Sequence, residues 1–179
     1  MRIISGTLGG RVIHPPTKMP YTRPTTDIAK EGLFNIIQNN LDIESLKTLD
    51  LFGGTGCISY ELASRGAAEL TIVEKDTAMY DFIKKTAEQL KIENIKIVKS
   101  DVFRFMESTP EQYDFIFAGP PYALTTIDDL PRTVFQKQLL KPKGWFILEH
   151  TPRNDYKKFP GYKTERNYGT TIFSIFIQE

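Results

Sequence analysis

The sequence predicts an α/β fold: a mostly parallel seven-stranded sheet with an antiparallel hairpin strand at its C-terminal end and a short N-terminal β extension. Three observations lead to this prediction. After residue 45, short apolar runs alternate with helical segments about every 20–25 residues, as in consecutive βαβ units. Runs such as FIF (115–117) and WFIL (145–148) are apolar throughout, which is typical of strands covered on both faces. The tail TIFSIFI instead alternates, which indicates a closing hairpin.

The expected elements follow in chain order. The first 20 residues look extended, with glycines and the pair Pro15-Pro16 as turn signals. Apolar residues three or four positions apart predict helices at 26–38, 57–65, 77–91, 102–108 and 126–140. Runs of β-branched and aromatic residues predict core strands at 47–52, 69–74, 95–98, 113–118 and 144–149. The two hairpin strands are expected at 161–168 and 170–177, joined through Gly169.

Length and composition indicate one domain. A chain of 179 residues can bury about 70% of the surface that its unfolded form exposes. We therefore expect a single domain over 1–179, with an extended segment at 1–24 and an α/β core at 25–179. Cys57 is the only cysteine in the sequence, so no internal disulfide can form. We find neither a signal-peptide pattern nor an apolar run long enough to cross a membrane, and therefore expect a cytoplasmic protein without a membrane partner.

Charged residues are unevenly distributed along the chain. Lys and Arg outnumber Asp and Glu in residues 1–35 and 137–179, whereas residues 36–136 are net acidic. If both basic ends fold to the same side, they form a surface that can face phosphates. The alternative is that these charges are solvated and have no partner.

The strongest local signal is DLFGGTG at 50–56, between the first core strand and a helix. Its glycines let the backbone turn sharply and approach a ligand closely. In open α/β sheets, ligands bind at such turns, at the carboxyl ends of the strands. Many glycine-rich turns only connect elements, so this loop gains weight from the residues that follow it.

Acidic residues end the next two core strands. Glu74 ends the second strand, where a carboxylate suits the two hydroxyls of a ribose. Asp101 follows the third strand, where it can accept a hydrogen bond from an adenine amino group. Either acid can instead cap the helix that follows it. Because parallel strands end at the same edge, we expect the loop and both acids to line one site.

These residues favour a cationic ligand without phosphate. A dinucleotide-binding loop has the pattern G-x-G-x-x-G, and here Ser59 occupies the third glycine position. The loop is not a P-loop, because no Gly-Lys-Ser/Thr follows it. Asp50 is poorly placed beside a pyrophosphate but suits an amine. S-adenosylmethionine offers an ammonium, a sulfonium, a ribose and an adenine, so we expect it as the cofactor.

These residues resemble the motifs of Rossmann-like class I methyltransferases. GPPY at 119–122 resembles the D/N-P-P-Y/F signature of enzymes that methylate exocyclic amines of bases. RIISGTLGGR at 2–11, TRPTTD at 22–27 and GLFNII at 32–37 are similar to the RsmD family, which methylates guanine N2 in small-subunit (16S) ribosomal RNA. The resemblance covers nearly the whole chain. It implies a class I fold, S-adenosylmethionine as cofactor, and ribosomal RNA as partner, either naked or within a small-subunit assembly particle.

The resemblance also implies roles for individual residues. The cofactor would be bound by Asp50, Phe52, Gly54, Gly56, Glu74, Asp101 and Val102. The catalytic loop would consist of Gly119, Pro120, Pro121 and Tyr122, with the Tyr122 ring stacking on a flipped-out base. RNA contacts would come from Arg2, Arg11, Lys18 and Arg23 in the 1–24 segment, and Thr25 would lie near the cofactor or the nucleotide.

One position departs from the family pattern: Gly119 stands where the signature has Asp or Asn. An exocyclic amine is a poor nucleophile, and acceptors on its hydrogens favour a pyramidal nitrogen whose lone pair is available. Without a side chain at 119 the Pro120 carbonyl remains, and losing a positioned acceptor costs roughly 10²–10⁴-fold in rate. Three explanations stay open: weak activity, replacement by another carboxylate such as Asp128 or Asp129, or binding of cofactor and RNA without catalysis.

Two functions compete with guanine-N2 methylation. The Pro-Pro-Tyr loop alone does not choose the base, so DNA adenine-N6 or cytosine-N4 methylation is one alternative. A catalytically weakened RNA-binding or ribosome-assembly factor is the other, and Gly119 is the feature that favours it. His14, His150 and Cys57 do not have metal-ligand spacing, so we expect no metal.

Overall fold

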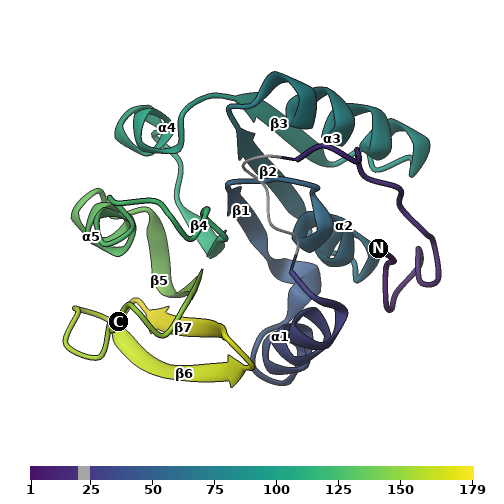
Figure 1. The fold of residues 1–179 in the computed structure, drawn as a ribbon. Coiled ribbons are helices and arrows are strands. Elements are labelled where there is room, and N and C mark those ends of the chain that lie inside the picture. The colour runs from purple at the N-terminus through teal and green to yellow at the C-terminus, as the bar shows by residue number, and fades with distance from the viewer. Residues whose placement is uncertain (20–24) are drawn as a thin grey trace.

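A computed structural model of the protein describes residues 1–19 and 25–179. In that part of the chain seven strands form one sheet, in the order β3-β2-β1-β4-β5-β7-β6 (Figure 1). The strands are β1 Lys47–Leu51, β2 Glu69–Glu74, β3 Ile95–Lys99, β4 Tyr113–Ala118, β5 Leu140–His150, β6 Tyr162–Tyr168 and β7 Thr171–Ile177. Strands β1 to β5 pair in parallel, and β7 is antiparallel to both β5 and β6. The predicted mixed sheet and its closing hairpin are confirmed.

Helices cover both faces of the sheet. They are α1 Asp27–Asn40, α2 Cys57–Ser64, α3 Thr77–Gln89, α4 Val102–Ser108 and α5 Asp129–Gln136, with a short 3-10 turn, η1, at Ile43–Ser45. Helices α1, α2 and α3 lie on one face, and α4 and α5 lie on the other (Figure 1). The side chains of β4 alternate to match: Phe115 packs with α1 and α2, whereas Ile116 packs with α4 and α5. Both faces are apolar because both are covered.

The structure corrects the ends of two predicted elements. The helix predicted at 126–140 is shorter, since α5 ends at Gln136 and Gln138 takes a left-handed φ of 53°. Strand β5 then begins at Leu140, earlier than the predicted 144–149, and Leu140 pairs with Tyr113. The register shifts between Tyr113 and Phe115, so the added strand residues are separated from the core of β5 by a bulge. The helical spacing of apolar residues had assigned Leu140 to the helix.

The N-terminal segment folds against the helices. Within residues 1–19, β pairing consists of an isolated bridge between Arg2 and Val12, so the expected β extension is short. Ile3 and Ile13 are buried in a cluster that includes residues of α2 and α3. This segment lies beside α2 and α3, whereas the basic C-terminal strands form the edge of the sheet next to α1 (Figure 1). Residues 1–19 and the C-terminal strands therefore lie at different ends of the sheet, whereas the start of α1 lies beside β6.

Candidate active site

A cavity of about 410 Å³ lies at the carboxyl ends of β1, β2 and β4. Within the sheet, β2 lies on one side of β1 and β4 lies on the other side. The cavity therefore lies at the point where the strand order reverses. Ligands bind at this switch point in open α/β sheets, and the volume is typical of small-molecule sites. The described residues that line it are Thr25, Asp50, 52–55, Cys57, Ile58, 74–77, Phe117, Gly119, Pro121, Leu124 and Glu149.

The loop from β1 to α2 forms one wall of the cavity through an unusual backbone path. Phe52 takes a φ of 63°, a left-handed conformation that is rare for a residue with a side chain and is found at functional sites. Gly53 has no space for a side chain, because a Cβ there would lie 2.3 Å from Cγ2 of Ile72. Its N–H donates to the Val73 carbonyl at 3.0 Å. The loop is therefore pressed against β2, and the cavity opens above it.

Asp50 lies below this loop and is 2% exposed. The Ser59 hydroxyl donates to its Oδ2 at 2.7 Å. Burial raises the pKa of Asp50 to about 7, against the lowering effect of the Ser59 bond, and the charge of Glu74 adds to the rise. A cationic group in the cavity would lower the pKa of Asp50 again, because it favours the ionised carboxylate. Asp50 is thus suited to bind an ammonium.

Glu74 ends β2 and connects two loops of the site. Its Oε1 accepts from the Gly54 N–H at 2.8 Å, and its Oε2 accepts from the Asp76 N–H at 2.8 Å. Two amide bonds hold the carboxylate in one orientation, and each carboxylate oxygen can accept a further bond. Glu74 therefore faces the cavity as a fixed acceptor, as a ribose-binding group requires.

Other predicted cofactor residues lie outside the cavity that the described residues form. Gly56 is the N-cap of α2, with a φ of 83°. Asp101 is exposed and caps α4, accepting from the Arg104 N–H at 3.1 Å. Val102 is buried in the core cluster under α4 and α5. Contacts of Gly56, Asp101 and Val102 with the cofactor stay predictions.

The 119–122 loop follows β4 and contributes to the same cavity. Gly119 and Pro121 line the cavity, whereas Pro120 is buried. The Tyr122 hydroxyl donates to Oε2 of Glu149 at 3.0 Å and lies 3.3 Å from Oγ1 of Thr171. Its ring is half-buried beside the loop, and its stacking on a base stays a prediction.

The carboxylates proposed from the sequence as substitutes for a side chain at 119 point elsewhere. Asp128 accepts from the Tyr156 hydroxyl at 2.9 Å, and Asp129 pairs with Arg132 at 3.3 Å. Both lie outside the cavity formed by the described part of the chain.

Glu149 is the site residue that the sequence reasoning missed. It is 4% exposed, near the end of β5, and lines the cavity. Oε1 accepts from Oγ1 of Thr25 at 2.7 Å, and Oε2 accepts from Tyr122. The signal was available: Glu149 ends the predicted strand 144–149, just as Glu74 ends its strand.

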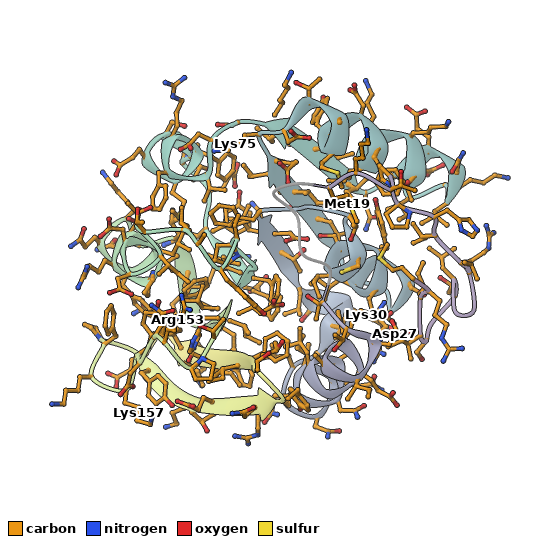
Figure 2. All side chains as sticks on the ribbon, in the orientation of Figure 1. Met19, Asp27, Lys30, Lys75, Arg153 and Lys157 are labelled. Atoms are coloured by element: carbon orange, nitrogen blue, oxygen red, sulfur yellow. The ribbon has the colours of Figure 1, made fainter. Side chains whose placement is uncertain are left out.

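Lys75 and Cys57 also line the cavity. Lys75 lies at the end of β2, directly after Glu74 (Figure 2). Cys57 is 8% exposed, and burial raises the pKa of its thiol to about 11. The Cys57 thiol is therefore protonated at neutral pH, as in a buried packing residue and unlike a nucleophile.

The predicted RNA-contact residues lie on the N-terminal segment. Arg2, Arg11 and Lys18 are exposed, and Arg23 lies outside the described residues. Among residues 1–19 and 25–179, we find no group of three or more His, Cys, Asp or Glu side chains placed to hold a metal ion. Over the same residues, none of the helices has the length and apolarity needed to span a bilayer.

The residues around the cavity fit S-adenosylmethionine. Among the described side chains that line it, the carboxylates are Asp50, Glu74, Asp76 and Glu149, and the cation is Lys75. This excess of acids suits a ligand that carries an ammonium and a sulfonium and has no phosphate. Asp50 is buried and Glu74 is held by two amide bonds, and their contacts with the ammonium and the ribose stay predictions.

Comparisons with known proteins agree with this chemistry. A family model described as conserved hypothetical protein 95 matches residues 1–177. Ribosomal RNA small subunit methyltransferase D of Escherichia coli (strain K12) is 32% identical over 149 residues, which cover 83% of this chain and 71% of that protein. The chain belongs to the RsmD family of methyltransferases.

Solved structures show the same fold for this RsmD-family chain. The E. coli protein yhhF, described by its name as a methyltransferase, is 25% identical with a TM-score of 0.88, covering 100% of this chain and 98% of that one. A T. thermophilus 16S rRNA N2 methyltransferase (RsmC), solved with AdoMet and guanosine, is 24% identical with a TM-score of 0.70. The match covers 87% of this chain and 44% of that chain. The predicted family and its Rossmann-like class I fold are confirmed.

Proposed function

We propose that the protein methylates guanine N2 in small-subunit (16S) ribosomal RNA, with S-adenosylmethionine as methyl donor. One observation carries the proposal: the acid-lined glycine loop and the Pro-Pro-Tyr loop line the same cavity. Asp50 and Glu74 contribute to it from the β1 and β2 ends, and Gly119 and Pro121 contribute from the β4 end. A donor bound by the acids is therefore close to a base bound by the Pro-Pro-Tyr loop. The names of the RsmD and RsmC relatives support ribosomal RNA and the N2 position.

The residues of the cavity act by holding the methyl donor and the target base in position. When bound, the cofactor supplies an electrophilic methyl group. Asp50 binds the ammonium end and Glu74 the ribose, so the donor is fixed along the glycine loop. The Pro120 carbonyl and the Tyr122 ring orient the target base on the other side. Alignment of two bound reactants replaces a bimolecular encounter and contributes the larger part of the rate, on the order of 7–11 kcal/mol in the best cases.

The ribosomal RNA partner is proposed to lie along the N-terminal segment. Arg2, Arg11 and Lys18 are exposed there and suit phosphate contacts, and Arg23 precedes Thr25 at the cavity. The net charge of +1 is small for an RNA-binding protein. We therefore propose that a small-subunit assembly particle, which adds protein contacts, is a better substrate than naked RNA.

A catalytically weakened assembly factor is the second candidate, because Gly119 does not have the expected side chain. Transfer of labelled methyl from S-adenosylmethionine separates the candidates. We expect label in unmodified small-subunit particles, less in naked 16S RNA, and none in DNA. Label in DNA adenine or cytosine supports the DNA alternative. Absence of label in all three, with cofactor binding intact, supports the assembly factor.

A further inference from the structure

Glu149 stands beside the position that Gly119 leaves without a side chain. A Cβ built on Gly119 would lie 3.9 Å from Oε1 of Glu149, within ordinary van der Waals contact. The same Cβ would lie 3.1 Å from Cε1 of Phe117, so a side chain at 119 is admitted only if that ring moves slightly. The carboxylate of β5 is therefore next to the place that an Asp or Asn at 119 occupies.

Glu149 is held in this place by donors from two different segments. The Thr25 hydroxyl, just before α1, donates to Oε1 at 2.7 Å. The Tyr122 hydroxyl, from the Pro-Pro-Tyr loop, donates to Oε2 at 3.0 Å. Hydrogen bonds to both oxygens fix the orientation of the carboxylate. Both Thr25 and Glu149 line the cavity, so the fixed carboxylate faces it.

The chemistry of an exocyclic amine calls for such a group. The lone pair of the amine nitrogen is delocalised into the ring of the base, and acceptors on the amine hydrogens favour the pyramidal form with a free lone pair. A carboxylate accepts and does not donate, so it recognises an N–H₂ group and disfavours a carbonyl in the same position. The Pro120 carbonyl alone provides one acceptor, whereas the amine has two hydrogens.

We propose that Glu149 is the carboxylate acceptor for the target amine and replaces the side chain that position 119 does not have. This inference rests on the proposed function, and it assigns the amine-recognising role to β5 instead of the β4 loop. One amine hydrogen is bound by Glu149 and the other by the Pro120 carbonyl. Glu149 is thus a catalytic residue, with Thr25 and Tyr122 as its positioning residues.

The methyl transfer balances with Glu149 in this role. The nitrogen lone pair forms the new C–N bond while the C–S bond of the donor breaks, and its electron pair stays on sulfur. The nitrogen is left with a positive charge and one proton more than the product carries. That proton passes along the existing hydrogen bond to the Glu149 carboxylate and from there to solvent. No oxidant, reductant or metal takes part in these bond changes.

The effect of a carboxylate at position 119 should depend on the residue at position 149. If Glu149 provides the acceptor, Gly119→Asp in the natural chain adds a second carboxylate next to the first. Like charges at this distance raise the pKa of one of the pair, so the added Asp brings no gain. In a Glu149→Gln background the same Asp restores a carboxylate at the amine. The effect of Gly119→Asp should therefore change sign with the residue at 149.

Nucleoside binding tests the proposal without depending on turnover. Inosine differs from guanosine by the missing N2 amine, so the ratio of the two affinities reports on amine recognition. We expect the S-adenosylhomocysteine-loaded protein to prefer guanosine by about tenfold or more, as measured by NMR titration. Glu149→Gln should reduce this preference to less than threefold. Glu165→Gln is the matched control, because Glu165 also accepts from a tyrosine hydroxyl but lies on β6.

Methyl transfer to small-subunit particles provides the second readout. We expect Glu149→Gln to lower the rate by roughly 10²–10³-fold. The double variant Gly119→Asp, Glu149→Gln should recover at least tenfold over Glu149→Gln alone. Calorimetric affinity for S-adenosylhomocysteine should stay within about threefold of the natural protein, which shows that Glu149→Gln is folded.

Two results overturn the proposal. One is an unchanged guanosine preference in Glu149→Gln, and the other is a Glu149→Gln rate within threefold of the natural protein. If Glu149→Gln does not fold, Tyr122→Phe replaces it; in that variant a guanosine preference unchanged from the natural protein also overturns the proposal. The proposed function fails separately, when the natural protein neither prefers guanosine nor transfers methyl to guanine.

Discussion

At the scale of single residues, Asp50 is proposed to connect the stability of the empty protein with cofactor binding. It is buried at the base of the cavity, with a pKa raised to about 7. An ionised Asp50 in the empty cavity is costly, because burial removes water and Glu74 adds a like charge. We propose that the ammonium of the bound cofactor provides the opposite charge. Part of the binding free energy would then come from stabilising the buried Asp50 carboxylate.

Cofactor affinity should depend on pH through Asp50. Lowering the pH from about 8 to about 6 protonates Asp50 and weakens S-adenosylhomocysteine binding by about tenfold. In Asp50→Asn this dependence disappears, and the affinity at pH 8 falls by at least tenfold. Isothermal calorimetry at both pH values measures the effect, with Glu69→Gln at the other end of β2 as control. A natural protein with equal affinity at pH 6 and 8 would contradict this role of Asp50.

The same shift predicts an opposite effect on stability. The folded pKa of Asp50 lies above its unfolded value, so this group favours folding at low pH, and that contribution is lost as the pH rises through about 7. Asp50→Asn should therefore raise the melting temperature of the ligand-free protein at pH 8. The difference should narrow as the pH falls, and the two proteins should melt at nearly equal temperatures only below the ordinary Asp pKa of 3.8. A lower melting temperature for Asp50→Asn at pH 8 would show that Asp50 stabilises the empty protein.

At the scale of elements, Glu61 attaches the N-terminal segment to α2. Its side chain is fully buried and accepts from the Ile4 N–H at 2.8 Å and the Ser5 N–H at 3.0 Å. Lys30, in the first turn of α1, lies 3.4 Å away and is itself 2% exposed (Figure 2). The Lys30 ammonium also donates to the Arg2 carbonyl at 2.6 Å. The buried Glu61 thus joins α1, α2 and the segment proposed to contact RNA.

Removing the Glu61 carboxylate should release the N-terminal segment from α2. Glu61→Ala leaves Lys30 as a buried charge with its carboxylate partner removed, which costs about 3–5 kcal/mol of stability. Burial raises the pKa of Glu61, but the amide bonds of the segment and the nearby cations outweigh it, so the pKa lies below its usual value. The stabilisation is therefore present at neutral pH and decreases as the pH falls below about 4.5.

Urea denaturation at pH 7 and pH 4 measures this effect. The difference between the natural protein and Glu61→Ala should shrink at the lower pH. Glu88→Gln, an exposed acid on α3, serves as control and should change stability by less than about 0.5 kcal/mol. Equal stability of Glu61→Ala and the natural protein at pH 7 would rule out the buried carboxylate as the anchor of the segment.

Much of the sheet could be predicted because its strands have simple apolar patterns. The run at 113–118 coincides with β4, and Gly169 joins β6 to β7 as expected. The start of β5 could not be predicted, since the apolar spacing at Leu139 and Leu140 also fits the end of a helix. A bulge and the left-handed Gln138, both set by tertiary packing, decide that boundary.

The site residues that could be predicted are the acids at strand ends beside the glycine loop. Asp50 and Glu74 lie at strand ends beside a glycine loop, and the structure places both in the cavity. Asp101 has the same sequence signal but lies outside the cavity, because a strand-end acid can equally cap the next helix. Glu149 was missed since no glycine loop follows β5, and its partner Thr25 lies 124 residues away in sequence.

At the scale of the whole molecule, the exposed basic residues of the N-terminal segment are proposed to bind RNA. Replacing Arg11 by Ala should weaken RNA binding and reduce the slope of log affinity against log salt by about 1. Lys137→Ala, on the other side of the sheet beside α4, is the matched control and should leave the slope unchanged. Filter binding of 16S RNA over a range of salt concentrations gives both slopes. An unchanged slope for Arg11→Ala would remove this residue from the RNA interface.

The switch in strand order between β1 and β4 organises the molecule. It opens one cavity between the loop that carries Asp50 and the loop that carries Gly119, and β5 adds Glu149 to it. The N-terminal segment lies beside α2 and α3, on the face of the sheet that also carries α1. Thr25, which precedes the N-cap of α1, also lines the cavity. We propose that the methyl donor, the target base and the RNA backbone are bound at separate places on this fold.

Identification of the methylated nucleoside tests the central claim most directly. Small-subunit particles that have not been methylated at the target are incubated with the protein and S-adenosylmethionine carrying a deuterated methyl group, and the RNA is digested to nucleosides for mass spectrometry. We expect the deuterated methyl on N2 of guanosine, at one nucleotide per particle. Deuterated methyl on adenosine or cytidine, or labelled nucleosides no more abundant than in a reaction without the protein, would contradict the claim.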